Sequence, residues 1–165
     1  MTKKTRVDFK AFLKKFPPVE MPVTISDEVS SEFSKRNDPL PMPLIEQYIT
    51  SFEEEEPDDL TEYVPCFKIK GTKKMDAVVY WKAGLMIYEY VLMTFSPKGD
   101  LIDRRVIAGT KVENEVVVKS VATIDEEYNI FVVGGVNKDG AEYNPGDSQS
   151  VSLQLLQTGK IAVLN

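Results

Sequence analysis

The sequence predicts an α+β protein that is mainly β, with two or three N-terminal helices packed on an antiparallel meander of seven or eight strands. The meander would form a curved sheet or a partly open barrel. Two observations lead to this class. From residue 61 onward, apolar runs of strand length recur about every 8–12 residues with turn signals between them. Before residue 53, apolar residues instead follow helical spacing and are interrupted by prolines.

The length of 165 residues favours a single domain, because one hydrophobic core usually serves about 100–200 residues. We expect a helical part at 1–52, an acidic loop at 53–60 and the β part at 61–165. No apolar run approaches the roughly 18 residues of a membrane span. The N-terminus lacks a secretory pattern and the chain has one cysteine, so we expect a cytoplasmic location.

Three short helices are expected in the N-terminal part, at 7–16, 26–34 and 43–51. The first has four apolar residues spaced i, i+3, i+4 and i+7, which form one continuous stripe. These residues are Phe9, Phe12, Leu13 and Phe16. Two prolines follow and end this helix. Because such stripes normally dock on a sheet, we expect the basic helix to be part of the core rather than a membrane-surface anchor.

Eight strands are expected in the β part, and residues 19–25 also look extended. The run 84–95 is apolar on both faces, so we expect this strand to be covered on both sides, with the helices on one of them. The expected strands lie at about 61–70, 75–82, 85–95, 101–108, 115–124, 129–136, 149–156 and 160–164.

Charge is distributed unevenly along the chain. Residues 1–16 hold six bases and one acid, whereas the other residues hold 14 bases and 25 acids and have a net charge of −11. Residues 53–62 alone contain seven acids and no base. Like-charge runs of this kind are normally solvated. The acidic bulk argues against nucleic acid as a partner, since phosphate binding requires a basic face.

The chain contains no histidine, which excludes the Ser-His-Asp and Cys-His arrangements as well as His-ligated metals. Cys66 has no histidine to activate it, so we expect an inert thiol, on the opposite strand face from Tyr63, Phe67 and Ile69. We therefore predict no catalytic residue, no metal site and no cofactor, and we favour a non-catalytic protein.

Three groups of residues are candidates for a site. Tyr80, Trp81, Tyr88 and Tyr90 lie in adjacent expected strands, where they could line a ligand pocket, form an interface or simply fill the core. Arg104 and Arg105 follow a turn and could form an anion site, although surface ion pairs with Asp103 are the simpler interpretation.

The third group is a fragment of a calcium-loop pattern in residues 137–142, with Asp147 nearby. The fragment lacks the alternating acids and final glutamate of the full loop. Asn, Asp and Gly are also the residues that an ordinary turn requires, so we favour a turn.

Three functions are compatible with these features. The first is a non-catalytic cytosolic interaction or regulatory module, such as an inhibitor or immunity-like protein, that binds another, basic protein. Its contact residues would be Glu53, Glu54, Glu55, Glu56, Asp58 and Asp59. The second is a small-ligand carrier with an apolar pocket between sheet and helices. The third is a carboxylate-based hydrolase or lyase, which needs two acids converging in one cleft.

Overall fold

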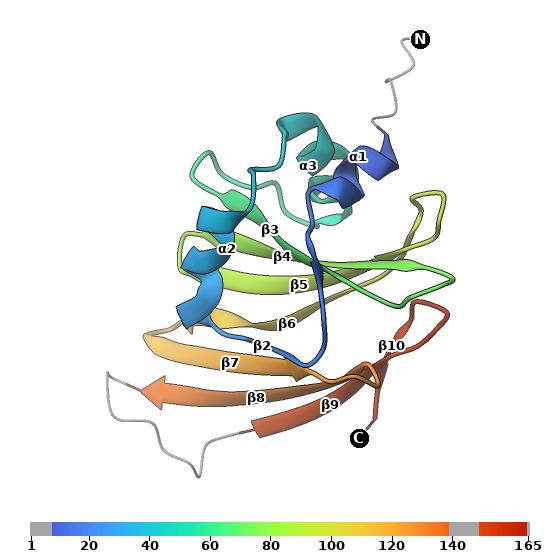
Figure 1. Ribbon diagram of the computed structural model, residues 1–165. Coiled ribbons are helices and arrows are strands. Elements are labelled where there is room, and N and C mark those ends of the chain that lie inside the picture. The colour runs from blue at the N-terminus through green and yellow to red at the C-terminus, as the bar shows by residue number, and fades with distance from the viewer. Residues whose placement is uncertain (1–7, 139–148, 165) are drawn as a thin grey trace.

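One large sheet dominates the computed structural model, which describes residues 8–138 and 149–164 (Figure 1). Most of the calcium-loop fragment expected at 137–142, together with Asp147, lies outside these residues. The strand order is β1-β3-β4-β5-β6-β7-β8-β9-β10, and β2 pairs with β7 beside this path. All neighbours from β3 to β10 are consecutive in the chain and antiparallel. The sheet is therefore an open meander, as predicted.

The strands match the expected ones closely, except that β6 continues five residues past the expected end at 108. Their bounds are β1 Pro18–Val19, β2 Val23–Ile25, β3 Glu62–Ile69, β4 Asp76–Gly84, β5 Ile87–Phe95, β6 Leu101–Glu113, β7 Val116–Ile124, β8 Asn129–Lys138, β9 Gln149–Leu155 and β10 Ile161–Val163.

The helices are short and lie N-terminal to β3, as predicted. They are α1 (Phe9–Lys14), α2 (Ser30–Arg36) and α3 (Met42–Tyr48), with single 3₁₀ turns η1 (Asp27–Val29) and η2 (Thr50–Phe52). Asp8 caps α1, because its Oδ1 atom accepts a hydrogen bond from the Lys10 amide at 2.9 Å. None of the described helices is long and apolar enough to cross a bilayer.

Two hydrophobic cores lie on opposite faces of strands β3 to β5. On one face, α1 and α3 bury Phe9, Phe12 and Phe16 against β4 and β5 (Figure 1). The other face is concave, and there β3, β4 and β5 pack with β7, β8 and β9 and with Phe33 of α2. The strand β5 is thus covered on both sides, which confirms the interpretation of its two-sided apolar sequence.

The segment between α1 and α2 crosses the concave face. Its first strand, β1, pairs in parallel with β3, and its second, β2, pairs with residues 122–124 of β7. This position on β7 is free because β6 pairs with β7 only over residues 109–113. The segment therefore links the β3 edge of the sheet to β7 (Figure 1).

One prediction about strand β3 is wrong. Cys66, Phe67 and Ile69 all lie in the concave-face core, whereas Tyr63 lies in the core beneath the helices. The pairing of β3 with β4 shifts between Pro65 and Phe67, and such a bulge reverses the alternation of faces. Cys66 is itself buried, and burial raises the pKa of its thiol well above the ordinary value.

Candidate functional site

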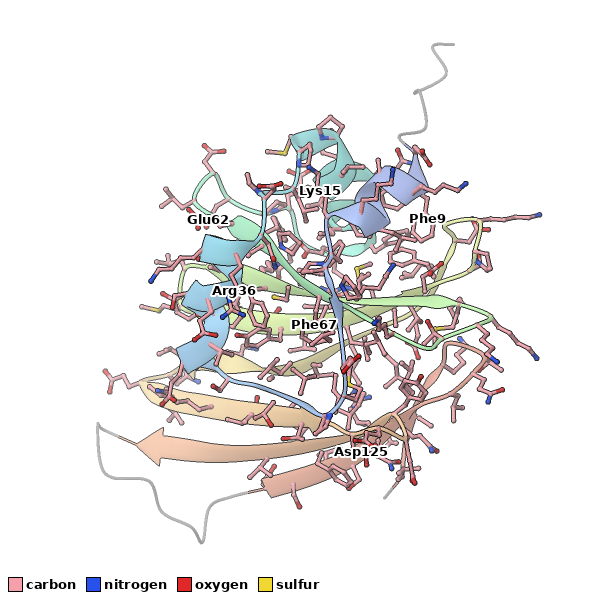
Figure 2. The ribbon with its side chains drawn as sticks, viewed as in Figure 1. Phe9, Lys15, Arg36, Glu62, Phe67 and Asp125 are labelled. Atoms are coloured by element: carbon pink, nitrogen blue, oxygen red, sulfur yellow. The ribbon has the colours of Figure 1, made fainter. Side chains whose placement is uncertain are left out.

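An open groove of about 1030 Å³ lies where α2 and α3 meet the acidic segment and the start of β3. Eight of its lining residues are acidic, and among the described residues none of those that line it is Lys or Arg. The acids are Glu46, Glu53, Glu54, Glu55, Glu56, Asp58, Asp59 and Glu62. We call this feature the acidic groove. Figure 2 shows Glu62 at the start of β3, on the side of the sheet where α2 lies.

The acidic segment is held by a turn as it leads into β3. The Asp58 carboxylate accepts hydrogen bonds from the Leu60 amide and the Thr61 hydroxyl, each at 2.9 Å. The Thr61 amide donates to the Asp58 carbonyl oxygen at 3.2 Å. This side-chain cap is the usual role of aspartate at turns, so part of the acidic run has a defined local conformation.

The opposite wall of the groove is tied to β3 by Asn37, at the end of α2. Its Nδ2 atom donates to the carbonyl oxygens of Pro65 and Cys66, at 2.6 and 2.9 Å. These carbonyls lie at the bulge, where the regular pairing with β4 shifts. The bulge thus provides the acceptors that hold α2 beside the groove.

Glu53 differs from the other acids of the segment, because its side chain is only 4% exposed. Its carboxylate accepts hydrogen bonds from the Tyr63 hydroxyl at 2.8 Å and the Lys82 ammonium at 3.2 Å. The Tyr80 hydroxyl lies at 3.5 Å, and an Arg104 Nη2 atom forms an ion pair at 3.7 Å. Glu53 therefore anchors the acidic segment to β3, β4 and β6 and is not a surface contact.

The two tyrosines of this cluster act as hydrogen-bond donors. Burial raises the pKa of Tyr63, and its hydrogen bond to Glu53 raises it further. Burial also raises the pKa of Tyr80, by more than the neighbouring Arg104 lowers it. Both phenols consequently keep their protons at neutral pH, which suits them to bind the Glu53 carboxylate.

Arg104 and Arg105 point to opposite faces of β6, as adjacent strand residues do. Arg104 donates to the Tyr80 hydroxyl at 3.2 Å and pairs with Glu53, whereas Arg105 is exposed. The nearby Asp103 accepts a hydrogen bond from the Ile161 amide at 2.8 Å. The structure therefore places the two arginines in different surroundings, and Arg104 is an internal partner of Glu53.

The four aromatic residues are distributed over both cores. Tyr80 is buried beneath the helices, and Trp81 and Tyr90 are buried in the concave-face core. The Tyr90 hydroxyl donates to the Ser26 carbonyl oxygen at 2.7 Å. Tyr88 is 42% exposed and stacks on Trp81 with ring centroids 5.9 Å apart. Tyr88 is the member of this group that a partner could contact directly.

Two other hollows have linings of a different character. One, of about 1160 Å³, lies between α1, α3 and the β5–β6 turn and is lined by both acids and lysines. The other, of about 220 Å³, is lined by Lys73, Lys74 and Tyr128 among others. Among the described residues, the small hollow has two lysines and no acid, whereas the acidic groove has eight acids and no base, so the groove carries the larger charge and most clearly selects a class of partner.

No family model, no curated protein and no solved structure matches this chain. Within the described residues, no group of three or more His, Cys, Asp or Glu side chains is arranged to hold a metal ion. The sequence indicated the acidic segment but not the separate role of Glu53. Lys82 and Arg104, which bind Glu53, lie far from it in the chain, and no local pattern relates them to it.

Proposed function

We propose that this protein is a non-catalytic interaction module whose acidic groove binds a basic segment of another protein. The observation that supports this best is the lining of the groove, with eight acids and no base. Such a surface attracts basic partners over distances of about 10 Å and accelerates their association at low salt. The buried, unpaired Cys66 supports a reducing location such as the cytoplasm as part of the proposal.

The exposed carboxylates would supply many weak contacts rather than one strong one. An exposed ion pair contributes at most about 1 kcal/mol, so affinity depends on engaging several carboxylates at once. Glu54, Glu55 and Glu56 are exposed and consecutive, which allows them to act together. Glu53 holds them in position from below through its bonds to Tyr63 and Lys82.

A lysine-rich synthetic peptide tests the proposal, with its binding followed by fluorescence anisotropy at low and high salt. Replacing Glu54, Glu55 and Glu56 with glutamine should weaken binding about tenfold, from three lost contacts of about 0.5 kcal/mol each. The matched control replaces the exposed residues Glu20, Glu126 and Glu127 with glutamine, which changes the net charge equally. An equal loss in both variants would show that only net charge matters and would contradict a site in the groove.

A further inference from the structure

The turn between β4 and β5 is apolar and exposed, which is unusual for a tight hairpin. Gly84 pairs with Ile87, so Leu85 and Met86 form a two-residue turn. Such turns normally use Asn, Asp or Gly, which tolerate positive φ. Here Met86 has φ = +59°, and the two side chains are 75% and 59% exposed. A bulky apolar residue is thus held in a strained backbone conformation without burying its side chain.

This turn is fixed in place by its neighbours. The Met86 carbonyl oxygen accepts a hydrogen bond from the Val112 amide at 3.1 Å, which ties the turn to β6. Next to it, Tyr88 stacks on Trp81 and remains partly exposed. The apolar side chains are therefore presented from a supported hairpin, which lowers the entropy cost of binding to them.

The turn adjoins the acidic groove. Ala83 of β4 pairs with Glu62 of β3, and a Cβ atom placed on Gly84 would lie 3.5 Å from the Thr61 hydroxyl oxygen. Thr61 and Glu62 both line the groove. Figure 1 shows the β4–β5 turn and the segment leading into β3 at the same end of the sheet.

A fourth exposed apolar residue lies in the segment beside this turn, next to Thr61, which approaches Gly84. Leu60 is 80% exposed and immediately precedes Thr61. We call Leu60, Leu85, Met86 and Tyr88 the apolar tip. Exposed apolar side chains gathered beside a polar rim are typical of protein contact sites.

We propose that the apolar tip and the acidic groove form one docking surface for an amphipathic basic segment of a partner protein. The apolar side chains of that segment would pack on Leu85 and Met86, while its basic side chains would lie over the groove carboxylates. Charge complementarity selects this occupant, because the groove repels an acidic segment or an anionic membrane. The inference rests on the proposed function and adds the apolar half of the recognition.

Two synthetic peptides of equal charge test this inference. One has leucines and lysines at amphipathic helical spacing, and in the other each leucine is replaced by serine. We expect the leucine peptide to bind at least about tenfold more tightly, as burial of one apolar side chain allows. Binding should also change the fluorescence of Trp81, the only tryptophan, because it stacks on Tyr88 of the tip.

Two variants separate binding from folding. Met86→Gly relieves the strain of the positive φ, so the unfolding midpoint should stay the same or rise. The same substitution should lower the affinity for the leucine peptide several-fold. Leu85→Ser combined with Met86→Gly should remove the preference for the leucine peptide. Phe131→Ser is the control, since Phe131 is also a large apolar residue and is 46% exposed, but lies on β8.

The outcomes distinguish the inference from the proposed function. Equal affinity for the two peptides, unchanged by Leu85→Ser with Met86→Gly, would overturn the apolar tip but leave the acidic groove intact. If the glutamine variant of residues 54–56 binds the leucine peptide as tightly as the unmodified protein does, the acidic groove is not part of the binding site. Adsorption of the protein to phosphatidylglycerol vesicles through Leu85 and Met86 would overturn the inference in favour of a membrane contact.

Discussion

The Oε2 atom of Glu53 lies 3.2 Å from the Nζ atom of Lys82, and both side chains are largely buried. This ion pair joins the first residue of the acidic run to strand β4. The Glu53 carboxylate also bonds to Tyr63 and pairs with Arg104, so it balances two cations at once. Glu53 thereby positions the exposed glutamates that follow it in the chain.

We expect Glu53→Gln to destabilise the protein by about 2–3 kcal/mol, because it leaves Lys82 and Arg104 unbalanced in a buried cluster. Urea unfolding measures the change. Glu54→Gln is the control, and as an exposed substitution it should change the free energy of unfolding by less than about 0.5 kcal/mol. Equal stabilities of the two variants would contradict an anchoring role for Glu53.

Gly109 should be irreplaceable in strand β6. Its φ is +143°, and an added Cβ atom would collide with the Tyr88 carbonyl oxygen on β5. Since that obstacle is backbone, we expect Gly109→Ala to destabilise the protein by about 3 kcal/mol or more. Gly84→Ala is the comparison, because its Cβ atom would meet only ordinary contacts. A thermal midpoint for Gly109→Ala within the range of Gly84→Ala would refute the steric argument.

Phe12 should be the residue through which α1 contributes most to stability. It is fully buried and contacts the rings of Phe16, Tyr48 and Phe95. We expect Phe12→Ala to reduce the free energy of unfolding by about 3–5 kcal/mol, as for other large buried aromatics. The exposed Met42→Ala on α3 provides the baseline. A small loss at Phe12 would mean that α1 is dispensable for the fold.

Asp27 should make stability depend on pH. Its Oδ2 atom is hydrogen-bonded to the Thr110 hydroxyl, and burial raises its pKa above the ordinary 3.8 by more than Lys119 lowers it. The neutral form is therefore favoured on folding. Its stabilising effect is complete below pH 3.8 and is lost as the pH rises through the folded-state pKa.

Asp27→Asn cannot ionise, so its stability relative to the unmodified protein should increase as the pH rises from 3.8 and then level off. Urea unfolding at a series of pH values follows this difference. Lys119→Gln should raise the pH at which the stabilising effect of Asp27 is lost, since it removes the charge that lowers the Asp27 pKa. A stability difference between Asp27→Asn and the unmodified protein that stays constant with pH would contradict the prediction.

Local patterns in the sequence were sufficient to predict most of the elements. In strand β9, Val151, Leu153 and Leu155 alternate with polar residues, and this period of two places one face in the core whatever its partner strand is. The stripe of α1 and the two prolines after it likewise determine a helix from neighbours in the chain. These features depend on contacts within a few residues, so sequence alone determined them.

The tertiary structure decided which acidic residues of the groove are buried and which are exposed. Glu53 and Glu54 are identical neighbours in the chain, yet one is a buried anchor and the other an exposed contact. The difference arises because Lys82 and Arg104, from two other strands, reach only one of them. The bulge after Pro65 similarly reverses the faces of β3 through its pairing with β4.

Sequence by itself determined the strands, the helices and the acidic run, because local periodicity and charge suffice for them. Which carboxylate is buried, and which apolar turn lies beside the groove, depends on contacts between distant strands that form only when the chain folds.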